Sequence, residues 1–270
     1  MAQKSTDGSR VFKLGRRRPI ARGLRLSLRN YLMRALPPPP TTIDYSGPAQ
    51  ASIAQVYGND NLGDCVIAGI AHLVGVFTGG ANNGQSYVYS SNDIIKLYGA
   101  IGGYVPDDPN TDNGCDEVTA LNYWQENGAP VGSHQISGWL AVSPNDQIEY
   151  RTALWLFENL YFGIELPDEW INPFPAQSGF VWDAASPSNP NNGHCVVGVG
   201  YTTGGVKIST WGMTGLITDA AIAQYASAGS GGQLYTVISQ DAINKATQKA
   251  PAGFDWSQLV ADFDSMGGNV

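Results

Sequence analysis

The feature that most limits the possible folds of this chain is the stretch from Cys65 to Phe77, which would be apolar on nearly all sides as a helix. A helix without a polar face is stable only when neighbouring elements cover it on every side. Asp64 stands before the stretch as a predicted N-cap, and Gly79-Gly80 follows it as a predicted stop. The chain has 270 residues, 43% of them hydrophobic, which suffices for a core around such a helix. We therefore expect one large domain, or two lobes that share a cleft, around a central buried helix.

The pattern changes from helical to strand-like along the chain. Helices are predicted around residues 91–99, 116–127 and 147–160, and a proline-rich loop over 165–192. Strands are predicted over 194–201, 206–211 and 233–239, with a hairpin turn at 202–205 and a last helix over 254–263. Helices first and strands second indicate an α+β fold with segregated lobes. We expect a helical lobe at about 41–130, an antiparallel β lobe at about 131–240 and a C-terminal helix at about 254–265.

Charge divides the sequence near residue 41. Residues 1–40 hold 10 of the 15 Lys and Arg residues and one of the 23 acids, whereas the net charge of the whole chain is -8. Four prolines, Pro37 to Pro40, end this basic extended arm. Because a proline run is stiff and extended, we place the domain boundary directly after it, near residue 41. The arm either lies along the chain's own acidic body or moves freely, or it binds an acidic partner such as nucleic acid or another subunit. Charge leaves both interpretations open.

Several classes of protein are excluded by what the sequence lacks. No apolar run reaches the about 20 residues of a membrane span, and no apolar segment follows the basic N-terminus as in a secretory signal. Three cysteines cannot all pair, so we expect a reduced compartment, with a cytoplasmic or virion-associated location. There is no P-loop, dinucleotide-binding, HExxH or CxxC motif. We therefore expect no cofactor and no metal.

Cysteine and histidine are scarce enough for their roles to be assigned by elimination. Cys65 follows Gly63-Asp64 at the predicted first turn of the buried helix. Free N–H groups there lower a thiol pKa, and the glycine leaves the sulfur accessible. His72 lies about 10 Å further along the same helix, too far to serve as the base. His194 opens a strand after a loop and is the candidate base, while Cys195 in the strand interior is interpreted as a packed thiol.

The spacing of these residues supports the pairing. His194 follows Cys65 by 129 residues, near the roughly 130–150 of papain-type peptidases. Further motifs resemble that family in the same order: Asp44-Tyr45, Asn59, Gly63-Asp64-Cys65, Asn113-Gly114-Cys115, Gly193-His194 with Gly200-Tyr201, and Ser209-Thr210-Trp211-Gly212. The chain resembles the papain-like superfamily over about residues 40–215, and within it a set of uncharacterised bacterial and bacteriophage proteins. This resemblance implies a papain-like two-lobed fold.

The resemblance also implies a role for each matching residue. Cys65 is the expected nucleophile and His194 the expected base, and Asn59 is expected to stabilise the oxyanion together with the Cys65 N–H. Ser209 falls where the family has the asparagine that orients the imidazole. Trp211 falls where a tryptophan shields that hydrogen bond from water. The residues expected to line the cleft beside them are Gly63, Asp64 and Gly193.

The orienting position departs from the family pattern. The Ser209 hydroxyl is shorter than an asparagine side chain. If residues 202–205 form a four-residue turn, strand pairing places His194 opposite Met213 rather than Ser209, unless a bulge at the glycines shifts the register.

Two further departures concern the oxyanion donor and the thiols. Asn59 is one methylene shorter than the family's glutamine, and Asn61 is a rival for its role. Leu62 stands where the family has the partner of its Asn-Gly-Cys cysteine, so Cys115 is predicted to be a free thiol. An arm of forty residues is short for an inhibitory propeptide, and we do not expect one.

Three functions follow from these residues. The leading hypothesis is a papain-like cysteine hydrolase acting on a peptide or amide substrate, most simply a peptidase. One alternative is an amide hydrolase acting on peptidoglycan. The other is a papain-fold scaffold with weak or no catalysis, such as a phage structural or virion-associated protein that assembles through residues 1–40.

Overall fold

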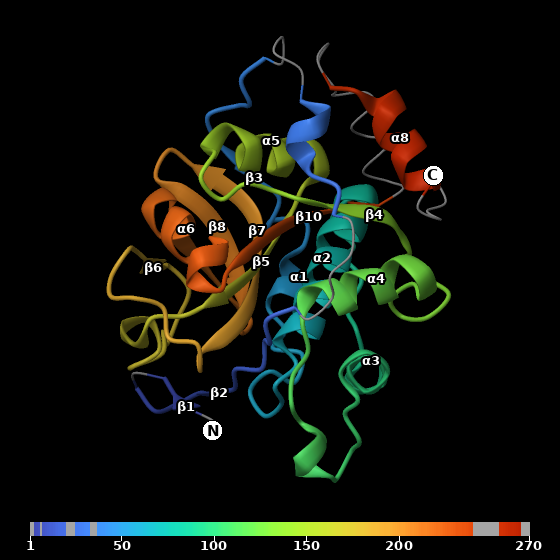
Figure 1. Ribbon diagram of the computed structural model, residues 1–270. Coiled ribbons are helices and arrows are strands. Elements are labelled where there is room, and N and C mark those ends of the chain that lie inside the picture. The colour runs from blue at the N-terminus through green and yellow to red at the C-terminus, as the bar shows by residue number, and fades with distance from the viewer. Residues whose placement is uncertain (1–2, 6, 20–24, 33–36, 240–253, 266–270) are drawn as a thin grey trace.

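The computed structural model describes residues 3–5, 7–19, 25–32, 37–239 and 254–265. It confirms the predicted α+β architecture, with helices beside a curved sheet (Figure 1). The helices are α1 (Gln50–Ile53), α2 (Cys65–Ala81), α3 (Ser91–Gly102), α4 (Glu117–Asn127), α5 (Gln147–Phe157), α6 (Asp219–Tyr225) and α8 (Trp256–Ser265). Short 3-10 helices are η1 (Leu28–Tyr31), η2 (Pro109–Thr111), η3 (Asp168–Trp170) and η4 (Ala228–Ser230).

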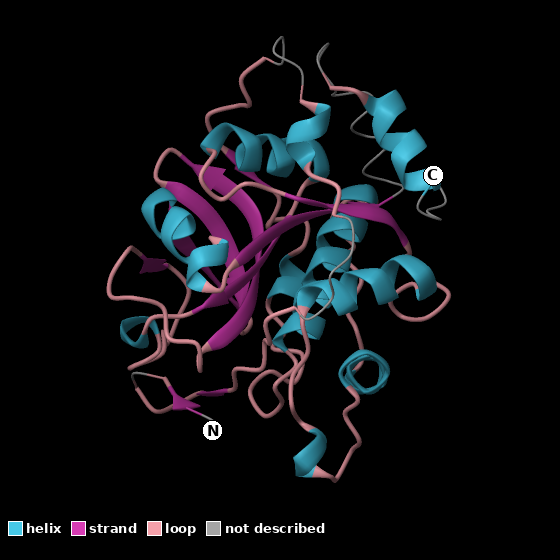
Figure 2. Cartoon of the chain, in the orientation of Figure 1, coloured by secondary structure: helices cyan, strands magenta, loops and turns pink. Residues whose placement is uncertain are grey.

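Eight strands of the described residues form one sheet (Figure 2). They are β3 (Ile43–Asp44), β4 (Ile136–Ala141), β5 (Leu160–Glu165), β6 (Phe180–Trp182), β7 (Gly193–Thr202), β8 (Gly205–Thr210), β9 (Met213–Thr218) and β10 (Gln233–Ser239). Their order is β4-β10-β5-β7-β8-β9-β6, with β3 paired to β7. Every pair is antiparallel except β6 with β9. Two further strands, β1 (Gln3–Lys4) and β2 (Val11–Phe12), form a separate hairpin.

Helix α2 is the predicted central buried helix. Each of its residues from Cys65 to Phe77 is buried, as a helix without a polar face requires. It packs against β7, and Gly69 allows a close approach to the sheet because a Cβ there would lie 2.7 Å from the Tyr161 ring of β5 and 3.2 Å from Cys195 Sγ of β7. The helix continues through Gly79-Gly80 and ends at Ala81, beyond its predicted stop. None of the described helices combines the length and apolar character needed to cross a membrane.

The sheet separates two hydrophobic cores. Val197 and Val199 of β7 pack with α2 in the core of the helical lobe. Val196, on the opposite face, packs with Leu154 of α5 and Ile208 of β8 in the core of the β lobe. This alternation is what a strand with both faces covered produces. Because the side chains alternate along β7, the neighbours His194 and Cys195 lie on opposite faces of the sheet, at the start of this strand.

Several elements differ from the sequence-based expectation. The helix expected over 147–160 ends at Phe157, because Glu158 adopts a left-handed backbone with φ of 65°, and β5 begins at Leu160. Strand β8 ends at Thr210, one residue earlier than predicted. The elements that were not anticipated include β4, β5, β6, β9 and α6. The predicted β10 has the bounds expected from the sequence.

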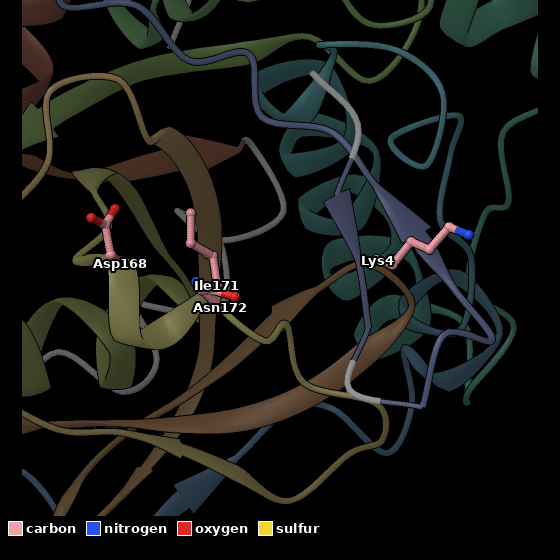
Figure 3. Close-up of a pocket in the computed structure, with 4 residues that line it drawn as sticks. All are labelled: Lys4, Asp168, Ile171 and Asn172. Carbon is pink, nitrogen blue, oxygen red and sulfur yellow. The ribbon is translucent and has the colours of Figure 1, made fainter.

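The described residues of the arm lie against the body of the molecule. Ser5 bridges to Phe174, and η1 packs beside α5 and α8. Residues 13–18, which connect these two parts of the arm, run between the helical lobe and the β lobe. They are visible in Figure 1 as the deep-blue ribbon near α1. Near β1, a pocket of about 490 Å³ is lined by Lys4, Asp168, Ile171 and Asn172. Figure 3 shows the Lys4 side chain pointing away from Asp168, and we assign this pocket no role.

Candidate active site

The Cys65 thiol lies at the N-terminus of α2 and is almost fully buried. Burial raises the pKa of this thiol to about 12, although backbone hydrogen bonds from Cys195 and Gly15 to the sulfur oppose the shift. The prediction of an accessible sulfur with a lowered pKa is therefore wrong for this state, because Gly15 of the arm lies over it. The same contacts place the thiol beside the residue that follows His194.

His194 is fully buried at the start of β7. Its Nε2 lies 2.7 Å from Thr210 Oγ1, and its ring stacks on Trp211 with centroids 4.3 Å apart and planes 19° apart. Trp211 therefore covers the imidazole as expected. His194 Nδ1 is buried without a hydrogen-bond partner among the described residues. Burial lowers the pKa of His194 to about 3, so the ring is neutral at pH 7.

Thr210, and not Ser209, contacts the imidazole. The turn between β7 and β8 contains only Thr203 and Gly204, and a register shift lies between Gly198 and Gly200. Val197 therefore pairs with Ser209, whose Oγ is buried without a hydrogen-bond partner among the described residues. The register shift considered in the sequence analysis exists, but it lies within β7 and not at the turn. As a result Thr210, the residue after Ser209, contacts His194.

A tight turn fixes Trp211 over His194. Strands β8 and β9 are joined by Trp211 and Gly212, with φ of 52° and 72°. Positive φ at both central residues is the geometry of a type I′ hairpin turn. A Cβ at Gly212 would lie 2.8 Å from the Ala54 carbonyl oxygen, so this turn also packs closely on the segment after α1.

Asn59 faces the arm from the loop before α2. Its Nδ2 donates to the carbonyls of Lys13 and Leu62, at 3.0 Å each. The donor expected to stabilise an oxyanion thus holds an arm carbonyl in this state. Its rival Asn61 is exposed, which makes Asn59 the better-placed donor.

Asp64 occupies the N-cap position of α2 but makes no side-chain capping hydrogen bond, contrary to the prediction. The carboxyl group is completely buried, and burial raises its pKa well above the ordinary value. Besides burial, negative charge at Asp64 is among the causes that raise the pKa of the neighbouring Cys65 thiol.

The arm fills the cleft between the lobes from Lys13 to Arg18. On the helical side, Lys13 N–H donates to the Asn59 carbonyl at 3.0 Å, and Arg17 N–H donates to the Cys115 carbonyl at 2.9 Å. On the β side, Arg16 N–H donates to the Gly193 carbonyl at 3.1 Å. These bonds connect one extended segment to both walls. Residues 13–18 therefore lie between the two walls, a position not anticipated from the sequence.

Glycines line this cleft where the arm passes. A Cβ at Gly63 would lie 3.2 Å from Gly15 Cα, and a Cβ at Gly114 or Gly193 would overlap the carbonyl of Gly15 or Arg16. Gly15 is equally constrained, because its own Cβ would overlap the Gly63 backbone. Only residues without a Cβ allow the two backbones to approach so closely.

Ion pairs attach the basic arm to the acidic body. Arg16 Nε pairs with Glu117 at 2.9 Å with both side chains fully buried, and Arg18 pairs with Glu165 at 2.5 Å. Lys13 also pairs with Asp112. The described part of the arm therefore lies on the chain's own acidic body, the first of the two interpretations drawn from charge.

The other cysteines and histidines lie outside this pair. Cys115 and Cys195 are free and buried, as predicted. His72 is packed in the helical core with its ring 5.0 Å from that of Tyr57. The described residues include no group of three or more His, Cys, Asp or Glu side chains suited to a metal ion. The chemistry available at this site is that of a thiol, an imidazole and nearby amide donors.

These features define the papain-like fold of cysteine proteases: a helical lobe, a mostly antiparallel β lobe, a cysteine at the start of the central helix and a histidine at the start of a strand that packs against that helix. Among solved structures the chain is similar to xylellain, a cysteine protease from Xylella fastidiosa, with a TM-score of 0.61 and 16% identity over 88% of this chain and 98% of that one. It is also similar to procathepsin L2 proteinase from Tenebrio molitor larval midgut, with a TM-score of 0.57 and 14% identity over 84% of this chain and 78% of that one.

A third similar structure is the proform of the ragweed pollen cysteine protease Amb a 11, with a TM-score of 0.51 and 14% identity over 77% of this chain and 67% of that one. No family model and no curated protein matches the chain. Identities of 14–16% establish the fold and not the activity.

Proposed function

We propose that this chain is a papain-like cysteine peptidase whose own N-terminal arm keeps it inactive. The observation that carries the proposal is the position of the Cys65 thiol at the start of β7. The thiol hydrogen-bonds the backbone of Cys195, the residue after His194, and His194 Nδ1 is buried without a hydrogen-bond partner among the described residues. A nucleophile needs such a base within reach.

We assign the proton of the neutral imidazole to Nε2, where Thr210 Oγ1 can accept it, so that Nδ1 serves as the base. When His194 Nε2–H donates to Thr210 Oγ1, at 2.7 Å, the neutral ring keeps Nδ1 as its acceptor. Trp211 covers this hydrogen bond and excludes water from it. The imidazole is thus held with Nδ1 free to receive the proton of the Cys65 thiol.

The reaction follows from these positions once the arm withdraws. Cys65 Sγ transfers its proton to His194 Nδ1, and the thiolate attacks the carbonyl carbon of a peptide bond. The Cys65 N–H and Asn59 Nδ2 stabilise the oxyanion. The C–N bond then breaks and the leaving amine takes the proton from His194. Water, deprotonated by His194, hydrolyses the thioester and regenerates the thiol.

The arm is held in a form that this chemistry does not cleave. The Gly15 carbonyl accepts from Cys115 N–H at 3.2 Å and makes no hydrogen bond to Asn59. Asn59 instead holds the carbonyl of Lys13. Burial under the arm also keeps both the thiol and the imidazole uncharged. Two of the similar structures are proforms, which agrees with an inhibitory role for this segment.

A steric substitution in the full chain tests the proposal. Gly15→Val places a side chain against the Gly63 backbone and should displace the arm, whereas Gly47→Val, with open space around its Cβ, is the matched control. We expect Gly15→Val to hydrolyse denatured casein at least about tenfold faster than the parent, because the free cleft is more populated. Adding Cys65→Ala should abolish that gain.

Two other outcomes support the alternatives. If limited proteolysis shows that Gly15→Val has released its arm but no amide substrate is hydrolysed, the chain is an inert scaffold. If peptidoglycan fragments are hydrolysed and casein is not, the chain is a cell-wall amide hydrolase that uses the same cysteine and histidine.

A further inference from the structure

The side chain of Arg16 is completely buried, whereas the side chains of its neighbours Arg17 and Arg18 are exposed. Its Nε donates to both carboxylate oxygens of Glu117, at 2.9 and 3.1 Å. Its Nη1 donates to the Gly231 carbonyl at 2.7 Å. A buried guanidinium with a carboxylate and a carbonyl around it occupies a built pocket and not a surface ion pair.

The pocket exists because two of its walls lack side chains. A Cβ at Gly163 of β5 would overlap the Glu117 carboxylate and lie 2.8 Å from Arg16 Nε. Gly231, after η4, supplies the carbonyl acceptor, and a Cβ there would overlap the Glu165 carboxylate. Glu117 itself is the first residue of α4, where the helix N-terminus favours a carboxylate. The space left between these residues holds the Arg16 guanidinium, with Nε and Nη1 hydrogen-bonded and Nη2 buried without a partner among the described residues.

Glu117 has no other cation close by among the described residues that would replace Arg16. Glu117 is completely buried, and the other ion pairs of the arm engage different carboxylates, Asp112 and Glu165. A buried carboxylate without a partner is strongly destabilising. When the arm leaves the cleft, the pocket therefore requires another cationic group.

The pocket lies next to the nucleophile. Arg16 directly follows Gly15, whose backbone hydrogen-bonds the Cys65 thiol. Consecutive Cα atoms are about 3.8 Å apart, so a side chain in this pocket belongs to a residue close to the bond under attack. A group that binds there would position a peptide for Cys65.

We propose that the Glu117 pocket selects an arginine side chain of the peptide substrate, and that Arg16 occupies the pocket in its place. This inference rests on the proposed peptidase function. Arginine is preferred because its planar group meets two carboxylate oxygens and a carbonyl together, whereas a lysine ammonium is a single point charge. The neighbouring Arg18–Glu165 pair contributes less selectivity, because Arg18 is 61% exposed.

Binding without turnover tests the pocket separately from the peptidase activity. The full chain carrying Cys65→Ala, Gly15→Val and Arg16→Ala has neither a nucleophile nor its own arginine in the pocket. Calorimetry would compare capped alanine pentapeptides whose central residue is arginine, lysine, citrulline or leucine. We expect the arginine peptide to bind at least about tenfold more tightly than the citrulline and leucine peptides, since a buried charged pair contributes strongly.

Glu117→Gln in the same chain should remove that preference, whereas Glu126→Gln, on the exposed side of α4, should leave it unchanged. The amide introduced by Glu117→Gln is uncharged and so avoids an unpaired buried carboxylate, which means this variant should fold at least as well as its parent. Equal affinities for the four peptides, or no binding of the arginine peptide, would overturn the inference. A different result is that the arginine peptide binds selectively while the Gly15→Val chain, which keeps Cys65, hydrolyses no casein. That result would support the arginine pocket and refute only the peptidase function.

Discussion

At the scale of single residues, burial determines the charge of the groups that matter. Cys65 and His194 are both neutral at pH 7 because burial excludes water from them. Burial also raises the pKa of Asp64 well above its ordinary value. A thiolate and an imidazolium require either water or each other for stabilisation, and the covered site offers them no water. Covering the site is therefore sufficient to prevent ionisation of the nucleophile.

His72 shows the same effect away from the site and gives a prediction for stability. Burial lowers its pKa to about 4 from 6.5, so between these values the unfolded chain binds a proton that the folded chain does not. Stability must therefore fall as the pH drops below 6.5. Between pH 7 and pH 5 the parent should lose about 2 kcal/mol more unfolding free energy than His72→Gln. Urea unfolding at both pH values measures this, and parallel pH dependence in the two chains would contradict it.

At the scale of elements, the sequence was most informative where a helix has no polar face and where strands end in turn residues. It predicted α2, β10 and the β7–β8 hairpin, because a buried helix and glycine-rich turns leave local signals, although the turn has two residues and not the four expected. It did not predict β4 or β5, whose apolar residues are buried on both faces and lack alternation. The partner of His194 could not be predicted, because the register shift in β7 depends on packing between strands.

Thr210 and Ser209 therefore provide a matched pair for testing which side chain acts on His194. In the Gly15→Val chain, Thr210→Val removes the Oγ1 acceptor at 2.7 Å and should lower kcat/KM by about tenfold or more. Ser209→Ala removes a hydroxyl without a described partner and should change kcat/KM by less than about twofold. Steady-state kinetics on a fluorogenic peptide measures both. If kcat/KM falls equally in the two variants, the Thr210 hydroxyl does not orient His194.

At the scale of the molecule, the charge asymmetry and the glycines have one explanation. The basic arm and the acidic body attract each other, and the ion pairs of Lys13, Arg16 and Arg18 fix the arm in register. Close backbone approach at Gly15 and Gly114 then seals the cleft over the thiol. The charges and the glycines are visible in the sequence, but which residues they contact can be seen only in the structure. Neither the arm's charge nor its length indicates that it passes between the lobes.

Cysteine alkylation measures directly whether the arm controls the nucleophile. In the parent, Cys65 should react slowly with iodoacetamide at pH 8, because its pKa of about 12 and its burial leave little accessible thiolate. In Gly15→Val the thiol regains water and an imidazole partner, so its reaction should be at least about tenfold faster and should reach its half-maximum at a lower pH. Cys115 and Cys195, which are also buried, should change little and serve as internal controls in mass spectrometry of the native protein. If all three cysteines accelerate together, the substitution has loosened the whole fold; if Cys65 reacts equally in both chains, the arm does not cover it in solution.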